Sequence, residues 1–496
     1  MRPRLRRPPA ALLLAAAALG ASLALPACRA DPPKLRLEAE PRLEPRLRAI
    51  LEAGPLPGRW SLAAPAEKAR AVLALVPAEA AGAGGRGAGR LWSAPALELA
   101  DPRFDLGEAE ARELGLSPLE SILPPLRAPS VEGRWPGEEG YPFVEELALV
   151  LRGEGRLPPP RELAAWAERA AAAAAARDGG PSALRAVGDL QAGPAELSIL
   201  ASGGSRMAEL FRGGLLEELR KADLLLGNLE GPISSRGSPN PRKRFLFRMP
   251  PGSARAFSSA GFDLLLFANN HAFDFGPEAF DDTLGELAQE ALPFVGAGPD
   301  AQSALAPRRL ELPAGGAILA FGFAAYPRER LGFTTGEAAA GEGRRGINAD
   351  EEATLASIRA AADQARTRGD EALIVLAHGG HEYVPAPPPE LRDRYRRFAE
   401  AGAALVIGSH PHVLQGVEAH GHTLIAYSLG NFLFTGLEEP PIARRSAALD
   451  FLLYRGIARG IRILPVIVDP RGSSLDPDRR AAERRFAALC AGLERK

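Results

Sequence analysis

The histidines of this chain are gathered in one part of it. All seven lie between residues 271 and 422, although the chain has 496 residues. Most belong to short polar clusters that also contain asparagine, aspartate or glutamate. Histidines scattered over a surface would not be distributed in this way, so the clusters indicate a shared site. They are Gly188-Asp189, Asn228-Leu229-Glu230, Asn269-Asn270-His271, the run from His378 to Tyr383 that includes His381 and Glu382, and His410-Pro411-His412.

The chemistry that these residue types favour is metal binding. A hard or borderline divalent cation such as Mn, Zn or Fe prefers a mixture of imidazole, carboxylate and amide oxygen. The chain has only two cysteines, Cys28 and Cys490, which excludes a disulfide framework and a cysteine-based zinc module. In an extended segment, residues two positions apart point the same way. The spacing of His410 and His412 therefore predicts that both imidazoles face one metal pocket.

Each cluster also has a simpler interpretation when it is taken alone. An aspartate after a glycine, such as Asp189, is usually a turn or helix cap. The Asn-Asn-His segment that ends at His271 is compatible with a loop that satisfies its own backbone, and a lone histidine such as His378 is often a hydrogen-bonded structural residue. Together, in this order and at the ends of apolar segments, the clusters favour a metal site.

The segments around these clusters predict an α/β fold. After Pro181, apolar strands alternate with amphipathic helices, and five of the strands run directly into a polar cluster. Ligands in such folds bind beyond the carboxyl ends of the strands, so the clusters are expected to converge. The expected strands are 183–190, 223–230, 261–271, 316–326, 371–380, 403–413 and 422–432, and the expected helices are 207–222, 277–291, 351–369 and 388–402.

The part of the chain before the alternating pattern is interpreted as a separate domain. Residues 29–180 contain no histidine and are rich in proline and alanine, with short strand-like pieces between turn signals. Residues 133–152 resemble part of an extracellular solute-binding fold. The alternative is a spacer that holds the following domain away from a membrane. The alanine-rich stretch 162–180 is expected to form a helix that joins this domain to residues 181–470, and residues 471–496 are expected to form a terminal helix with Cys490 buried or half-buried.

The first 28 residues have the pattern of a secretory signal. Four arginines precede an apolar stretch from about Ala11 to Leu25, which is short for a membrane span and suits a signal-peptide core. The stretch ends in Leu25-Pro26-Ala27-Cys28, which resembles the lipobox of bacterial lipoproteins. We therefore expect a protein outside the cytoplasm, attached by lipid on Cys28 to the cell membrane or outer membrane. The alternative is an ordinary secretory signal with a chance cysteine.

Composition and net charge indicate the class of protein and the kinds of partner that it can bind. The chain is 46% hydrophobic and 24% charged, which is typical of a globular protein with two or three domains. Its 60 basic and 61 acidic residues give a formal net charge of -1. This balance argues against nucleic acid as a partner. The basic run Arg242-Lys243-Arg244 is interpreted as a solvated surface, with an anionic-polymer contact as the alternative.

The motifs resemble those of a known family. The segments GDL, NLEGP, FANNHAFDFG, HGGHEY, VIGSHPHVLQGVE and IAYSLGNFLF are similar to those of the capsule-synthesis CapA family, within the calcineurin-like metallophosphoesterase superfamily. The resemblance covers roughly residues 185–468. It implies a four-layer αββα sandwich of two sheets flanked by helices, preceded here by the smaller N-terminal domain, with a two-metal centre at the strand ends.

The resemblance also implies roles for individual residues. Two divalent ions would activate a water molecule and neutralise charge on a phosphate-like oxygen. His271 matches a residue that contacts phosphate or protonates a leaving oxygen, and Asp274 is a candidate to orient it. Asn228, His381 and Glu382 are expected to line or support the pocket and to bind substrate. The implied metal ligands are Asp189, Glu230, Asn270, His378, His410 and His412.

Two positions depart from the family pattern. Relatives usually have His-Trp-Gly where this chain has His378-Gly379-Gly380, which predicts a more open pocket wall. Gln191 stands where an apolar residue often follows the first aspartate. Neither change removes a ligand, although both weaken inferences about substrate. His420 and His422 are interpreted as solvated residues of a hairpin turn.

Two functions remain for such a protein. The first is a lipid-anchored enzyme of the metallophosphoesterase type that acts on a phosphoester or an anionic envelope polymer, such as poly-γ-glutamate, during its synthesis or export. The second is a non-catalytic, metal-binding scaffold in a polymer-synthesis complex. Retention of His271 favours the enzyme.

Overall fold

A computed structural model describes residues 180–494 apart from 194–195, 330, 369–370 and 435–439, together with separate segments between residues 34 and 170. The expected signal sequence and Cys28 lie outside the described residues, as does much of the alanine-rich stretch. Residues 165–170 of that stretch are helical.

The larger of two sheets in the C-terminal half has nine strands. Its order is β12-β27-β26-β25-β11-β13-β14-β15, with β24 also paired to β11. Four neighbouring strands are parallel, and the alternating pattern predicts the first three but not the short fourth one: β11 (Ser182–Gln191), β13 (Leu224–Leu229), β14 (Leu264–Leu266) and β15 (Phe294–Val295). The remaining strands are β12 (Phe211–Arg212), β24 (Asn431–Phe434), β25 (Arg445–Tyr454), β26 (Ile457–Asp469) and β27 (Gly472–Leu475).

The second sheet has six strands in the order β17-β18-β20-β21-β23-β22. Its centre is parallel, and each edge is closed by an antiparallel strand. Gly421 and His422 connect β22 to β23, and His420 is the last residue of β22, which confirms the hairpin turn expected there. The strands are β17 (Arg308–Glu311), β18 (Ala317–Ala325), β20 (Glu371–Gly379), β21 (Leu405–Ser409), β22 (Val417–His420) and β23 (Thr423–Ala426).

The two sheets pack face to face, and strand β20 shows why both of its faces are apolar. Ile374 and Leu376 join the core shared with the nine-stranded sheet, whereas Leu373 and Val375 join a second core under two helices. This period of two follows from the alternation of side chains along a strand. A parallel strand covered on both faces reads as a continuous apolar run, as this one does.

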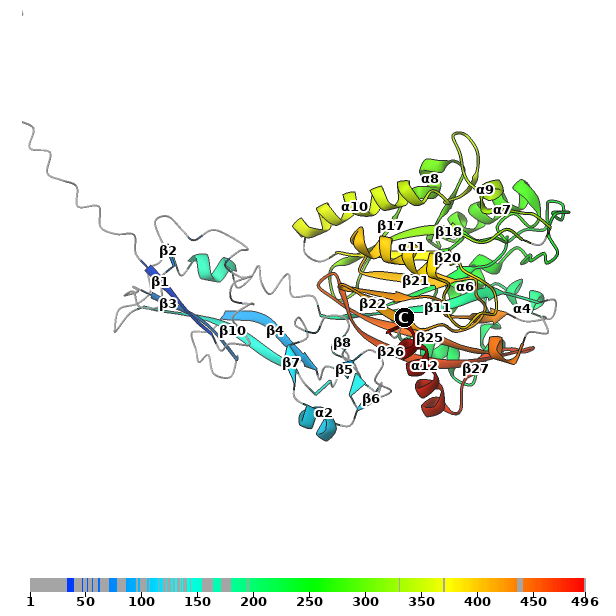
Figure 1. Cartoon of the computed structure of the whole chain (residues 1–496). Helices are drawn as coiled ribbons and strands as arrows, with labels where there is room; N and C mark the ends of the chain where they lie inside the picture. Colours follow the sequence, from blue (N-terminus) through cyan, green and yellow to red (C-terminus); the bar gives the residue numbers. More distant parts are fainter. Residues whose placement is uncertain are drawn as a thin grey trace, which may run out of the picture.

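Helices complete the four layers. Helices α10 (Glu351–Arg368) and α11 (Pro389–Glu400) cover the outer face of the six-stranded sheet, where Phe398 packs on Phe323 with ring centroids 5.3 Å apart (Figure 1). Helices α6 (Ser253–Ala260) and α7 (Gly276–Gln289) bury their apolar faces in the core of the nine-stranded sheet. The expected αββα sandwich is therefore confirmed.

One expected helix is wrong. The amphipathic pattern of residues 207–222 predicts a continuous helix, but the structure has a 3-10 turn at Met207–Glu209, the short strand β12 and then α5 (Leu215–Leu219). Between β12 and α5, Gly213 and Gly214 adopt φ values of 61° and 82°. Two consecutive left-handed residues end a right-handed helix, and glycine adopts that conformation without a steric penalty.

The N-terminal part contains a sheet of its own, at the left of Figure 1. Six strands between residues 34 and 153 pair in the order β2-β1-β3-β10-β4-β7. They are β1 (Lys34–Ala39), β2 (Ser61–Leu62), β3 (Ala71–Pro77), β4 (Arg86–Ala94), β7 (Ser117–Pro118) and β10 (Val144–Gly153).

The chain ends in a helix, as expected, although the element begins later than residue 471. Residues 472–475 form β27, which lies between β12 and β26 in the large sheet, and helix α12 runs over Arg479–Glu494. Cys490 is buried, and its sulfur accepts a hydrogen bond from the Val417 amide at 3.3 Å. Within the described residues, no helix combines the length and apolar character needed to cross a membrane.

Candidate metal centre

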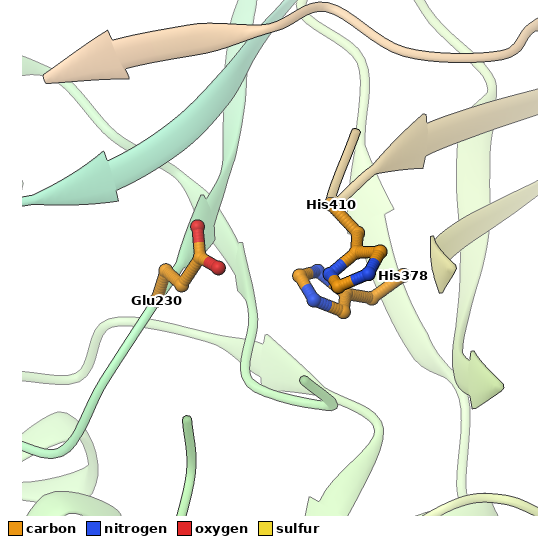
Figure 2. Close-up of side chains that lie close together, drawn as sticks. All are labelled: Glu230, His378 and His410. Carbon is orange, nitrogen blue, oxygen red and sulfur yellow. The ribbon is translucent and has the colours of Figure 1, made fainter. Parts of the chain in front are cut away.

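The predicted ligands converge at one end of the two sheets. Asp189 lies in β11 and Glu230 directly follows β13, both in the nine-stranded sheet. His378 lies near the end of β20, and His410 directly follows β21, both in the six-stranded sheet. Figure 2 shows Glu230 reaching from one side toward His378 and His410 on the other. The polar residues at the strand ends thus meet because the strands end on the same side.

The side chains form two overlapping groups. In the first, ligand atoms of Glu230, His378 and His410 all lie within 4.8 Å of one another. In the second, ligand atoms of Asp189, Glu230 and His412 meet the same limit. All five residues are buried. Glu230 is common to both groups, so its carboxylate lies where it can bridge two ions.

Several buried polar atoms of this centre have no hydrogen-bond partner. Neither carboxylate oxygen of Glu230 and neither ring nitrogen of His410 takes part in a hydrogen bond, although the residues are 0% and 3% exposed. Leaving buried polar atoms unsatisfied is costly, and such atoms in a folded protein call for an explanation. A divalent ion between them would satisfy both residues, so the side chains present fit a metal.

The electrostatics of the centre agree with this fit. Burial and the nearby charge of Asp189 raise the pKa of Glu230 well above its ordinary value. Burial lowers the pKa of His412, but the carboxylates of Glu230 and Asp189 outweigh this effect and raise it to about 10. The two carboxylates therefore favour a positive charge beside them. A metal ion would supply that charge and leave His412 a neutral ligand.

Asn270 and His378 are held together. His378 Nε2 lies 2.9 Å from Asn270 Oδ1, as two ligand atoms of a single ion would. The other ring nitrogen, Nδ1, lies 3.1 Å from Ser409 Oγ and 3.3 Å from Asn228 Nδ2. Hydrogen bonds of this kind on the far side of a ligand histidine orient its ring.

His412 is oriented by a residue that sequence reasoning missed. Its Nδ1 lies 2.9 Å from Asn431 Oδ1 and 3.2 Å from Asp189 Oδ2. Asn431 begins β24, which pairs with β11 beside Asp189. The signal that could have identified Asn431 is its position in SLGNF, a segment that resembles the family motif.

The conformation predicted for His410 and His412 is wrong. The segment is not extended, because φ is 98° at His410 and 57° at His412. The two rings still enter the centre, with centroids 6.0 Å apart, but they belong to different ligand groups. Left-handed backbone is unfavourable for residues other than glycine and is stored at functional sites when the surrounding structure enforces it. The Tyr383 amide, which donates to the Pro411 carbonyl at 2.8 Å, helps to hold this turn.

His271 lies beside the two groups and is held by Asp274. The distance from His271 Nδ1 to Asp274 Oδ2 is 2.7 Å, and the opposite nitrogen, Nε2, is 3.9 Å from Glu230 Oε1. The imidazole stacks on Phe247 with centroids 3.9 Å apart. Burial raises the pKa of Asp274 to about 7, although Lys243 lowers it in part.

Lys243 corrects the interpretation of the basic run as solvated surface. Its side chain is fully buried, and the ammonium lies 2.7 Å from Asp274 Oδ1 and 3.2 Å from Glu329 Oε1, and donates to the Asn270 carbonyl. Glu329 also accepts from Asn270 Nδ2 at 3.2 Å. Lys243 and Glu329 therefore hold Asn270, and sequence reasoning missed both functions because the two residues lie in loops. Only Arg242, which pairs with Glu337, and Arg244 are exposed.

The sequence model of the bacterial capsule synthesis protein family PGA_cap matches residues 183–436, which include every ligand of both groups. The chain belongs to this family. The predicted relationship to capsule-synthesis proteins is thereby confirmed.

Three relatives show how similar this chain is to known proteins. The chain is 32% identical over 216 residues to the PGA biosynthesis protein CapA of Bacillus subtilis (strain 168), which covers 43% of this chain and 54% of that protein. It is 28% identical over 221 residues to the capsule biosynthesis protein CapA of Bacillus anthracis, covering 44% and 51%. A probable polyglutamine synthesis accessory protein of Mycobacterium tuberculosis (strain ATCC 25618 / H37Rv) is 30% identical over 255 residues, covering 50% and 66%.

The match thus spans about half the length of the two CapA relatives. A solved structure of the sulfate thiohydrolase SoxB from Thermus thermophilus is 18% identical, with a TM-score of 0.31, covering 53% of this chain and 42% of that one.

An open cavity of about 380 Å³ lies beside the centre of this capsule-synthesis family member. It reaches the centre at Asn270, His271 and His410. Exposed His381 and Glu382 lie along it, as expected of pocket-lining residues. Asn228 does not line it: this residue is 3% exposed and donates to Asp189 Oδ1 at 2.8 Å beneath the ligands.

At Gly379, the first departure from the family pattern, the backbone lies against the neighbouring strand. Gly379 pairs with Ala325 of β18, and a Cβ atom at this position would come within 2.4 Å of the Ala325 carbonyl oxygen. Glycine therefore permits close approach of the two strands. Gln191, the second departure, is buried, and its side-chain amide donates to the Ala192 carbonyl at 2.7 Å.

Proposed function

We propose that the protein is a two-metal phosphoester hydrolase that acts in the synthesis or export of an anionic capsule or envelope polymer. The observation that carries the enzymatic part is the sharing of Glu230 by two buried ligand groups. A bridging carboxylate between two ligand sets is the arrangement expected of a centre that holds a pair of ions. Two-metal centres stabilise both the attacking and the leaving oxygen of a displacement at phosphorus.

The residues divide between the two ions as follows. Asp189 and His412 would hold one ion, His378, His410 and Asn270 the other, and Glu230 both. The pair would polarise a phosphoryl oxygen and activate a water molecule near neutral pH. Asn228 and Asn431, which contact Asp189, His378 and His412, would keep the ligands oriented.

His271 would supply a proton to the leaving oxygen. Asp274 engages Nδ1, so Nε2 is the nitrogen that faces Glu230 and the centre. His271 also lines the cavity, where a leaving group has room. A side chain that is fixed by a carboxylate on one nitrogen and exposed to substrate on the other suits general acid catalysis.

The polymer part of the proposal rests on the relatives. Two of them are named for capsule or PGA biosynthesis and one for polyglutamine synthesis. We extend that role to this chain as a component of a polymer-synthesis complex. We also propose that it works outside the cytoplasm, attached to the membrane by lipid on Cys28, because the first 28 residues have the charge and apolar pattern of a lipoprotein signal.

The test combines metal content with turnover. Wild-type protein supplemented with Mn, Zn or Fe is expected to hold close to two ions per chain and to hydrolyse bis(4-nitrophenyl) phosphate. His410→Ala removes a ligand of one group and is expected to lower the metal content. The matched control is His420→Ala, because His420 lies half-exposed in β22 and contacts Glu400. Absence of metal in the supplemented wild type would refute the proposal.

A scaffold with a structural metal is the second candidate. The observation that favours it is the burial of the five grouped ligands, each at most 3% exposed. Structural metal sites are closed, whereas catalytic sites keep an open position. Full metal content without turnover on any phosphoester would select the scaffold, and turnover that depends on the bound metal would select the enzyme.

A further inference from the structure

The mouth of the cavity carries two arginines that the proposed chemistry does not use. Arg244 and Arg328 both line the cavity, and both are exposed. Within the described part of the chain, neither forms an ion pair with a carboxylate, whereas their neighbour Arg242 pairs with Glu337. The cavity therefore joins a metal centre at one end to two uncompensated guanidinium groups.

The acidic residues of the cavity do not neutralise these arginines. Glu329 is engaged by Lys243 and by the amide of Asn270. Glu382 acts on the metal centre instead, because its charge contributes to raising the pKa of both Glu230 and His412. Bound ions would offset Glu382, and the mouth would keep its positive charge. This distribution is complementary to an anion.

Apolar surface accompanies the two arginines. Phe245 and Leu331 also line the cavity, and they are among the most exposed large apolar residues of the described chain, at 50% and 52%. The Arg244 guanidinium lies 4.9 Å from the centroid of the Phe245 ring. Such a contact holds a guanidinium in place while leaving its edge free to donate. An organic group could rest on Phe245 and Leu331 between the two ends.

We propose that Arg244 and Arg328 form a subsite for a second anionic group, a phosphate or a carboxylate, on the molecule whose phosphoester binds at the metal centre. The inference rests on the proposed function, and it names the substrate class as a phosphoester with a distal anion. Guanidinium groups recognise both anions through paired N–H donors. A substrate with a single phosphate would leave both arginines without a partner.

Three phosphonates that cannot be hydrolysed test this subsite by calorimetry on the metal-loaded full chain. Hexylphosphonate has no second anion, 6-phosphonohexanoate adds a carboxylate, and hexane-1,6-bisphosphonate adds a second phosphonate. We expect both dianionic probes to bind wild type about tenfold more tightly than hexylphosphonate, and the stronger of the two identifies the distal group. The advantage is expected to shrink at high salt, because the arginines are exposed.

The double variant Arg244→Gln with Arg328→Gln is expected to abolish this advantage. Its matched control is Arg345→Gln, which removes an exposed arginine that pairs with Asp281 outside the cavity. An advantage that survives in the double variant, or wild type that binds the three probes equally or not at all, would overturn the subsite. Wild type that discriminates among the probes but hydrolyses no phosphoester would retain the subsite and refute the hydrolase.

Discussion

Asn270 shows how single residues prepare this centre. Its side-chain oxygen meets His378, its side-chain nitrogen donates to Glu329, and its backbone carbonyl accepts from Lys243. Because the nitrogen is engaged by a carboxylate, the oxygen is the atom presented to the ligand group. The neighbouring residue, His271, is fixed in turn by Asp274. Adjacent residues therefore make different contacts, because Asn270 meets His378 whereas His271 meets Asp274.

Substitutions of His271 and Asn270 separate the roles proposed for them. His271→Ala is expected to keep the metal content and to lower turnover by roughly 10²- to 10⁴-fold, the usual contribution of a positioned acid. Asn270→Ala is expected to lower the metal content itself. Metal analysis and bis(4-nitrophenyl) phosphate hydrolysis on both variants make the comparison. Unchanged turnover in His271→Ala would remove its assigned role.

Substitution of Lys243 tests the buried charge cluster. Lys243→Met leaves Asp274 without its cation in a site where both side chains are fully buried. Removing one partner of a buried ion pair costs about 3–5 kcal/mol, so the free energy of unfolding should fall by that order. Lys221→Met is the control, because Lys221 is exposed and pairs with Glu218, and about 0–1 kcal/mol is expected. Urea unfolding measures both, and similar losses would contradict this role for Lys243.

The candidate metal ligands could be predicted from the sequence, whereas the residues that hold them in place could not. Asp189, Glu230, His378 and His410 could be predicted because each stands at the end of an apolar strand. Lys243 could not, because an exposed and a buried lysine look alike in a run of basic residues. Its burial depends on Asp274 and Glu329, which are distant in sequence and adjacent only in the fold.

At the scale of elements, the strand order explains the convergence of the ligands. Most of the parallel strands of the two large sheets were predicted from periodicity, as were the helices α7, α10 and α11. The antiparallel strands β25 and β26 were not anticipated, because they do not lead into a polar cluster. The left-handed turn of His410 and His412 was equally hidden, since nothing local favours it; contacts such as that between Tyr383 and Pro411 impose it.

Close strand approach beside Asp189 yields a prediction for glycine. A Cβ atom at Gly188 in β11 would lie 1.8 Å from the Gly430 carbonyl oxygen. Gly188→Ala must therefore displace backbone, and we expect it to lower the free energy of unfolding by about 1–3 kcal/mol and to reduce metal binding. Gly285→Ala is the control, because a Cβ atom at Gly285 in α7 would meet no atom within 4 Å beyond the neighbouring backbone of its own helix, and a gain of about 0.5–1 kcal/mol is expected. Thermal melts and metal analysis compare the two, and equal effects would contradict the steric argument.

At the scale of the whole molecule, the N-terminal residues predict where the protein works. Expression of the full chain in a bacterial host is expected to yield a mature protein that begins at Cys28, carries lipid there and partitions into detergent. Cys28→Ser is expected to remain unmodified and to partition into the aqueous phase. Mass spectrometry of the N-terminal peptide decides the matter, and an unmodified wild-type peptide that begins elsewhere would exclude the anchor.

The ligand groups are drawn from both sheets, so they form only when the two sheets have assembled. Asp189 and His412 are separated by more than two hundred positions in the chain, and they meet only when both sheets have assembled. An unfolded chain therefore offers no preformed centre, and on the proposed function metal binding would be coupled to the assembly of the two sheets. Affinity for divalent ions follows a fixed series in which zinc ranks above manganese and iron, so the ions acquired depend on what is available at that moment. On the proposed two-metal function, the compartment in which the chain completes its folding would therefore select its metal.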